Sequence, residues 1–260
     1  CDGTVSVKLS EPNMMCNVSL FGMADGVAGE VIHIVLAKEI STVSDVEAIR
    51  DNYYGYYVLR NDIDFNYSSG DLALFEPFPV FYGILDGNGH QLRNIMFDTK
   101  SEATDYGMIL HNYGDIRNLT LQTSISFYDS LGKGVRYVGG ITAINSGTLY
   151  NCTVSSAKYF YVANENSYVG GLAGLNEGLI TESRCYMIIF GDKYAGGIAG
   201  KNTGTVEYCA NLRNLFVDEK NDETGVSGIV GDNSGTVTDS AHFAEVYVGL
   251  DDFNFSEEHE

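Results

Sequence analysis

The 260-residue sequence predicts an all-β fold, a solenoid in which short parallel strands stack on one another, and three observations point to it. A short unit of glycine, aliphatic residues and asparagine recurs six times. Apolar residues nowhere keep the spacing of three and four over the eleven or more positions that a long helix needs. The chain also has 30 glycines against three prolines, which indicates turns made with glycine.

One asparagine marks each copy of the repeat, and the residues around it keep one pattern. The asparagines are separated by 24, 33, 31, 26 and 31 residues. They are Asn88, Asn112, Asn145, Asn176, Asn202 and Asn233. Glycine stands five positions before each of them, an apolar residue four before, and an aliphatic residue four after. A unit this short cannot bury its apolar side chains alone, so each copy is expected to stack on its neighbours as one coil.

The same columns predict how each coil turns and what joins it to the next. Glycine adopts positive φ without steric cost, so we expect the repeat glycines to make the turns. The second glycine of each pair would also let the wall of the coil pass close over the core. Asparagine amides that lie above one another can both donate and accept hydrogen bonds, which predicts a structural ladder of asparagines.

Three of the five cysteines fit this stack as small core residues. Cys152 and Cys209 share one column, seven residues after the asparagine, with Ser183 between them. They would lie two coils apart, roughly 9.6 Å, beyond the reach of a disulfide. Cys185 falls in another column, aligned with Val154.

Three segments resemble the GLUG repeat of bacterial surface proteins. Beginning at Tyr168, Tyr194 and Val226, they read Tyr-Val-Gly-Gly-Leu-Ala-Gly-Leu-Asn-Glu-Gly, Tyr-Ala-Gly-Gly-Ile-Ala-Gly-Lys-Asn-Thr-Gly and Val-Ser-Gly-Ile-Val-Gly-Asp-Asn-Ser-Gly. That repeat is found in the β-helical regions of IgA-protease-type metallopeptidases and in filamentous-haemagglutinin-like adhesins. The resemblance extends over roughly residues 40–245 and implies a right-handed parallel β-helix. It implies no particular activity, because such repeats sit beside many different functional domains.

The repeat divides the chain into three parts. Residues 1–39 are expected to form a small β segment or the tail of a preceding domain, residues 40–248 the β-helix, and residues 249–260 an acidic tail. Residues 44–47 match a capping box, which predicts a short helix through about Asn52 with Val46 and Ile49 facing inward. This helix would cover the first coil, since the end of a stack exposes strand edges.

Longer connections between copies, at residues 122–136, 155–167 and 212–224, all enter at one phase of the repeat and are expected on one side of the coil. They carry the aromatic residues Phe127, Tyr128, Tyr159, Phe160 and Tyr161. Aromatic side chains on loops over one face would suit a surface that binds a glycan or a protein. The alternative, which we favour, is that these rings extend or cover the sheet.

The charge of the chain excludes some partners. Fifteen basic against 35 acidic residues leave a net charge of −20, whereas a surface that neutralises phosphates needs clustered lysine and arginine. Nucleic acid is therefore excluded as a partner. A membrane would be reached only through a lipid anchor at Cys1, as in a cleaved lipoprotein, unless a fragment simply begins there. We expect an extracellular protein of a bacterial cell surface, whose partner, if it has one, is a host or cell-surface glycan or protein.

Motifs that would identify an enzyme are absent from the sequence, which contains no HExxH, no GxSxG and no phosphate loop. The segment from Asp86 to His90 (Asp-Gly-Asn-Gly-His) sits where a turn is needed. Asp62 and Asp64 share an outward strand face, but two carboxylates fall short of the six or more ligands of Ca²⁺. The position six after each asparagine reads Asn, Asn, Asn, Glu, Tyr and Asp, so no carboxylate repeats on adjacent coils, as a polysaccharide-degrading site would require.

These observations favour a non-catalytic module that acts as an adhesin or as a structural spacer. We expect no catalytic residue, no metal site and no cofactor, and the pattern identifies no ligand-binding residue. Two alternatives remain open. One is a polysaccharide lyase or hydrolase built on a β-helix, and the other is an accessory region of a secreted metallopeptidase.

Overall fold

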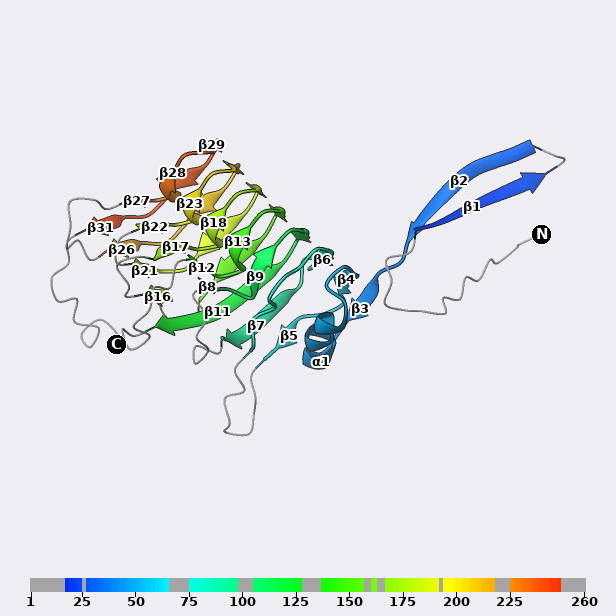
Figure 1. Ribbon diagram of the computed structural model, residues 1–260, viewed down its shortest axis with the longest axis horizontal. Helices are drawn as coiled ribbons and strands as arrows, with labels where there is room; N and C mark the ends of the chain where they lie inside the picture. The colour runs from blue at the N-terminus through cyan, green and yellow to red at the C-terminus, as the bar shows by residue number, and fades with distance from the viewer. Residues whose placement is uncertain are drawn as a thin grey trace.

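The computed structural model describes residues 17–24, 27–65, 75–97, 105–127, 137–156, 160–162, 167–191, 194–217 and 225–248. Within these ranges the chain is all-β apart from one short helix and the 3-10 turn that follows it, so the predicted fold class is confirmed. Successive strands wind into coils whose equivalent strands pair in parallel (Figure 1). The predictions for Cys1, Tyr128, Tyr159 and residues 249–260 fall outside the described residues.

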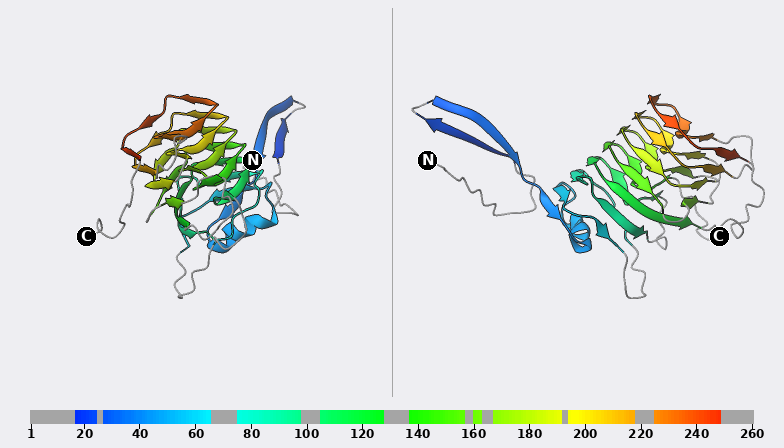
Figure 2. Two further views of the ribbon diagram at one scale, coloured as in Figure 1. Left: turned by 60° about the vertical axis from the view of Figure 1, so that its left-hand side comes forward. Right: turned by 180° about the vertical axis from the view of Figure 1, so that it is seen from behind.

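Five coils of four or five strands form the main body of the solenoid, and Figure 2 shows their parallel stack from two further sides. The first comprises β8 (Asp105–Tyr106), β9 (Ile109–Asn112), β10 (Asp115–Arg117) and β11 (Thr120–Phe127). The second comprises β12 (Tyr137–Gly139), β13 (Thr142–Asn145), β14 (Thr148–Tyr150), β15 (Thr153–Ser155) and β16 (Phe160–Val162). The third comprises β17 (Tyr168–Gly170), β18 (Ala173–Asn176), β19 (Leu179–Thr181), β20 (Arg184–Tyr186) and β21 (Ile189–Gly191). The fourth comprises β22 (Tyr194–Gly196), β23 (Ala199–Asn202), β24 (Thr205–Glu207), β25 (Ala210–Asn211) and β26 (Leu215–Val217). The fifth comprises β27 (Gly225–Ser227), β28 (Val230–Asn233), β29 (Thr236–Thr238), β30 (Ala241–His242) and β31 (Val246–Val248).

Shorter coils precede these five. They are built from β3 (Lys38–Ile40), β4 (Tyr56–Leu59), β5 (Ile63–Asp64), β6 (Ile84–Asp86) and β7 (Gln91–Met96). One sheet of eight strands runs the length of the stack in the order β3-β4-β6-β10-β14-β19-β24-β29. Ahead of it, β1 (Asn17–Ala24) and β2 (Val27–Val35) form an antiparallel hairpin that extends away from the coils (Figure 1). The sheet thus begins at Lys38, and whether residues 1–39 belong to a separate domain stays a prediction.

A short helix, α1 (Val43–Glu47), continues into a 3-10 turn, η1 (Ala48–Asp51), and lies against β3 at the N-terminal end of the stack. Val46 and Ile49 are buried, as predicted. The predicted capping box at residues 44–47 was wrong by two positions. Thr42 is the N-cap, and its hydroxyl accepts from the Asp45 amide while the Asp45 carboxylate accepts from the Thr42 amide. Asp45 therefore takes the role that the pattern assigned to a glutamate, and the helix begins two residues earlier.

The asparagine ladder exists across all five main coils. Each amide nitrogen donates to the amide oxygen of the next coil, and the four distances lie between 2.7 and 2.8 Å. The ladder runs through Asn112, Asn145, Asn176, Asn202 and Asn233. The first four of these are fully buried. Each asparagine also donates to the carbonyl two residues on, so the ladder satisfies backbone groups of the turn as well.

Asn88 was wrongly placed in this column. It lies in the turn after β6 with a φ of 52°, and its amide donates to the Leu59 carbonyl. The residue that pairs with Asn112 in the preceding coil is Phe81. The register of β6 with β10 places Leu85, and not Leu92, beside Ile116. The interval of 24 residues to Asn112, shorter than the others, reflects this misalignment.

The repeat glycines are required for close approach between chain segments and not for positive φ. Among the described residues, Gly89 is the one glycine with a positive φ. The turns that need positive φ use other residues instead, which are Asn88, Asn94, Asn118, Asn151, Glu182, Tyr208 and Asp239. At Gly171 a Cβ would stand 2.3 Å from the Gly197 carbonyl oxygen and 2.5 Å from Cys185 Sγ. The column was predicted correctly, but the cause is steric.

The expected long connections contain strands, at least in part. β11 continues through Phe127, and β16 and β26 arise within the other two predicted insertions. The backbone of β16 pairs with β11 on one side and with β21 on the other, which aligns Tyr161 with Phe190. Phe127, Phe160 and Tyr161 therefore extend a sheet, which is the alternative favoured from the sequence.

The cysteine columns are confirmed. Cys152, Cys185 and Cys209 are buried free thiols. The Ser183 hydroxyl accepts from the Cys152 amide and Ser240 accepts from the Cys209 amide, so cysteine and serine alternate along one column. Cys185 pairs with Val154 in the neighbouring sheet. Burial raises the pKa of Cys152 and Cys185 to about 12 and that of Cys209 to about 11, which keeps the thiols protonated and unreactive.

Candidate functional site

The outer face of the eight-stranded sheet carries the candidate site. Neighbouring strands in this sheet place their outward side chains in two columns, with Asp86, Arg117, Tyr150 and Thr181 in register on β6, β10, β14 and β19. These side chains surround a shallow, open hollow on the surface of the solenoid. It is lined by Asp86, Asp115, Arg117, Asn118, Thr148, Tyr150, Leu179 and Thr181.

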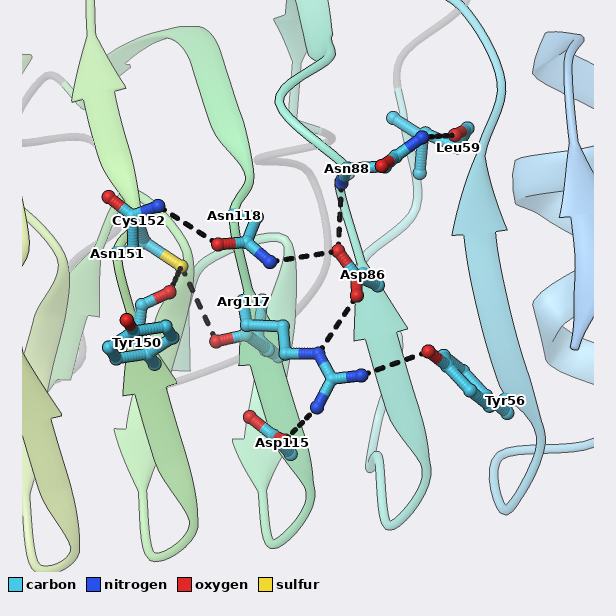
Figure 3. Close-up of polar contacts among 11 residues, drawn as sticks. Tyr56, Leu59, Asp86, Asn88, Asp115, Arg117, Asn118, Tyr150, Asn151 and Cys152 are labelled. Carbon is cyan, nitrogen blue, oxygen red and sulfur yellow. Dashed lines mark hydrogen bonds and ion pairs between the residues drawn. The ribbon is translucent and has the colours of Figure 1, made fainter. Parts of the chain in front are cut away.

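The Arg117 guanidinium lies at the centre of this cluster and contacts three acceptors (Figure 3). Its Nε donates to Asp86 Oδ2 at 2.9 Å, one Nη donates to Asp115 Oδ2 at 3.2 Å, and the other donates to the Tyr56 hydroxyl at 2.9 Å. These bonds join strands β4, β6 and β10, so the cluster fixes three adjacent coils against one another. They also use three of the five guanidinium N–H groups.

A second row of amides leads into the same cluster. Asn151 donates to the Asn118 side chain at 2.9 Å, and Asn118 donates to Asp86 Oδ1 at 3.1 Å. The Asn88 backbone amide donates to the same oxygen at 2.9 Å. Asp86 therefore has both oxygens occupied, which explains why an aspartate stands at the end of β6.

The electrostatics keep this cluster ionised. Burial raises the pKa of Asp86, but hydrogen bonds from Asn118, from the Asn88 amide and from Arg117 outweigh it, and the net pKa is lowered. Burial likewise lowers the pKa of Arg117, but the hydrogen bond to Asp86 and the other interactions with Tyr56 and Asp86 together outweigh it, and the net pKa is raised. A glycosidase acid needs a carboxyl group whose pKa is raised. Asp86 is shifted in the opposite direction, which suits it to holding Arg117 and to accepting hydrogen bonds.

Sequence reasoning missed this arrangement. It held residues 86–90 to be a turn, which is correct for Asn88, but it found no carboxylates on adjacent coils. Asp86 and Asp115 do come from adjacent coils, since β6 pairs with β10. The pair was hidden because the first copy of the repeat was aligned on Asn88, which lies outside the asparagine ladder. Aligning Gly83 with Gly114, 31 residues apart, would have placed Asp86 beside Arg117.

Asp62 and Asp64, weighed as calcium ligands, instead contact side chains and backbone of the next coil. Asp62 Oδ1 accepts from the Gln91 amide at 3.2 Å and lies 3.4 Å from His90 Nδ1. Asp64 Oδ1 accepts from the side-chain nitrogen of Asn94, Nδ2, at 2.7 Å. Across the part of the chain that the structure describes, no three histidine, cysteine or acidic side chains are grouped to hold a metal ion.

A hydrogen-bonded row on the surface joins Tyr113, His111, Ser146 and Glu177, and its histidine and serine invite comparison with a catalytic pair. His111 Nε2 lies 3.0 Å from Ser146 Oγ, and Ser146 donates to Glu177 at 2.7 Å. Because the serine proton is directed at Glu177, His111 Nε2 must donate to Ser146 and cannot act as its base. Burial lowers the pKa of His111 despite the nearby charges of Glu177 and Asp105. The row is therefore a set of contacts between coils.

No protein-family model matches the chain. Over an alignment of 166 residues the chain is 32% identical to halomucin of Haloquadratum walsbyi, and this alignment covers 56% of this chain and 2% of that protein. Among solved structures, an IgA1 protease is similar at a TM-score of 0.53 and 15% identity, over 91% of this chain and 23% of that one. The chain thus spans a small part of each protein. The IgA1 protease similarity shows a common β-solenoid fold, and the GLUG resemblance stays at the level of the motifs. No helix within the described ranges has the length and apolar character to cross a membrane.

Proposed function

We propose that this chain is a non-catalytic solenoid module of a larger extracellular protein, where it serves as a rigid spacer or adhesive segment on the cell surface. The asparagine ladder carries this proposal. Its four hydrogen bonds between asparagine side chains join five coils in register, and the eight-stranded sheet extends the same stack toward the N-terminal side. Such a stack resists bending because each inner coil is hydrogen-bonded to the coils on both sides of it.

The comparisons support the extracellular placement and the modular role. The two similar proteins are named IgA1 protease and halomucin, and both names suit proteins that act outside the cell. This chain corresponds to 23% of one protein and 2% of the other, as expected for a module repeated or inserted within a longer chain. The IgA1 protease similarity also favours a second candidate, an accessory region of a secreted peptidase that holds or orients the catalytic domain.

The lowered pKa of Asp86 and the paired state of Arg117 support the non-catalytic part of the proposal. Incubation with a panel of neutral and acidic polysaccharides tests it, with new reducing ends and unsaturated products as readouts. We expect neither, whereas turnover of any polysaccharide would establish a lyase or hydrolase. Small-angle scattering tests the spacer role, for which the particle must keep one rod-like length in low and high salt. A particle that collapses or bends would contradict it.

A further inference from the structure

The polar groups of the hollow around Arg117 can form more hydrogen bonds than the fold uses. Arg117 retains two guanidinium N–H groups after its three bonds. Asp115 gives one oxygen to Arg117, and none of the described residues donates to the other. Both groups are already held in place, so a ligand that bound them would lose little of its affinity to ordering side chains.

The opposite half of the hollow differs in chemistry. One coil further along the stack, Tyr150 stands in register with Arg117, and Thr148 stands in register with Asp115. Leu179 and Thr181 follow on β19. The Tyr150 side chain remains 37% exposed. Over three strands, about 10 Å, the surface thus changes from charged donors and acceptors to an aromatic ring, an aliphatic side chain and hydroxyl groups.

We propose that this hollow binds a neutral saccharide, with hydroxyl groups of one sugar ring on Asp115 and Arg117 and a C–H face of the saccharide against Tyr150. The proposal rests on the extracellular, non-catalytic function above and identifies the ligand class of that module. A sugar ring has polar hydroxyl edges and an apolar C–H face, and it can both donate to Asp115 and accept from Arg117.

The charges of the hollow select among ligands. Asp86 and Asp115 against Arg117 leave a net charge of −1, and the chain as a whole carries −20, so uronic acids and sulfated glycans are repelled. A cation is opposed by the guanidinium, which lies within 3.2 Å of both carboxylates. A neutral polyol meets neither penalty. Because the hollow is shallow, the expected affinity is weak, with a Kd on the order of 1 mM for one oligosaccharide chain.

The test is calorimetric or NMR titration of the whole chain with mannohexaose, cellohexaose and xylohexaose, with trigalacturonate as the acidic probe and spermine as the cationic one. We expect at least one neutral oligosaccharide to bind and neither charged probe to do so. Tyr150→Ala and Asp115→Asn should each weaken binding by roughly tenfold or more. Tyr186→Ala is the matched control, because that tyrosine is similarly exposed on the neighbouring sheet and lies outside the hollow.

Thermal melting of each variant verifies that it is folded. Failure of every neutral probe, preference for a charged probe, or binding that both hollow variants leave unchanged would overturn the saccharide site. Each of these results leaves the spacer role intact. Release of new reducing ends in the same samples would instead overturn the proposed non-catalytic function.

Discussion

Replacing Asn176 by alanine removes the central link of the asparagine ladder. Asn176 is fully buried, accepts from Asn145 Nδ2 at 2.8 Å and donates to Asn202 Oδ1 at 2.7 Å and to the Thr205 carbonyl at 3.0 Å. In the variant, Asn145 Nδ2 keeps two carbonyl partners, those of Gly147 and Leu179. The buried Asn202 Oδ1, however, loses the donor in this ladder.

The cost follows from these contacts. A net hydrogen bond contributes about 1 kcal/mol, and a buried acceptor left without a donor costs about 1–3 kcal/mol. We therefore expect Asn176→Ala to lower the free energy of unfolding by about 2–4 kcal/mol. Asn233→Ala is the control. That side chain is exposed at the end of the ladder. Its oxygen accepts from Asn202 Nδ2 and from the Gly235 backbone amide, and the Asn202 nitrogen keeps two carbonyl partners when Asn233 is removed. Its expected cost is about 1 kcal/mol or less.

Urea denaturation measures both variants, followed by far-ultraviolet circular dichroism and by the fluorescence of the 18 tyrosines, since the chain has no tryptophan. The two probes should give the same midpoint if the coils unfold together. Equal costs for Asn176→Ala and Asn233→Ala, or a cost below about 0.5 kcal/mol for the buried position, would refute the argument that the ladder stabilises the stack.

Three further changes test the core, the spacing of coils and the candidate site. The buried thiols, whose pKa is raised to about 11–12, should resist iodoacetamide at pH 8 until urea unfolds the chain. Because the fold holds these thiols protonated, they stabilise it fully below the unfolded pKa of about 8.5. This contribution is lost at higher pH, so the urea midpoint should fall as the pH rises from about 9 toward 11. Labelling of Cys152, Cys185 or Cys209 in the native chain at pH 8, identified by mass spectrometry of the peptides, would contradict their burial. Gly171→Ala, which places a Cβ 2.3 Å from a backbone oxygen, should cost about 1–3 kcal/mol in the same urea assay, and a neutral result would show that the coils can separate. Arg117→Met should raise the pKa of Asp86 in carbon-13 NMR titrations. The lowered pKa of Asp86 stabilises the fold above about pH 4, and this contribution is lost in acid, so acid should unfold the variant at a higher pH than the parent chain. An unchanged Asp86 pKa in the variant would exclude the ion pair.

Much of the stack could be predicted because its cause is local. A column of asparagines at a near-constant interval, followed by glycine two residues on, describes a turn whose hydrogen bonds repeat from coil to coil. The cysteine and serine column was equally readable, since Cys152, Ser183 and Cys209 keep the same distance from that asparagine. In both cases the interaction partners are equivalent residues of adjacent copies.

The candidate site could not be predicted in the same way. Arg117, Asp86 and Tyr56 come from three copies that do not share one motif, and their meeting depends on the register of the early coils. The same early coils carry an irregularity in the neighbouring sheet, between β7 and β11, where Asn94 adopts a φ of 59° and the pairing shifts by one residue. A count along the chain that assumes regular copies therefore misplaces the outward side chains.

The sequence by itself determined that the chain coils, which residues face the core, and that asparagine and cysteine lie in columns, because stacking repeats the same local geometry at every copy. Only the tertiary structure decided which outward side chains meet. That outcome depends on the lengths of the early connections, because shifting a strand by one residue turns its side chains to the opposite face. The hollow around Arg117 is a consequence of that register.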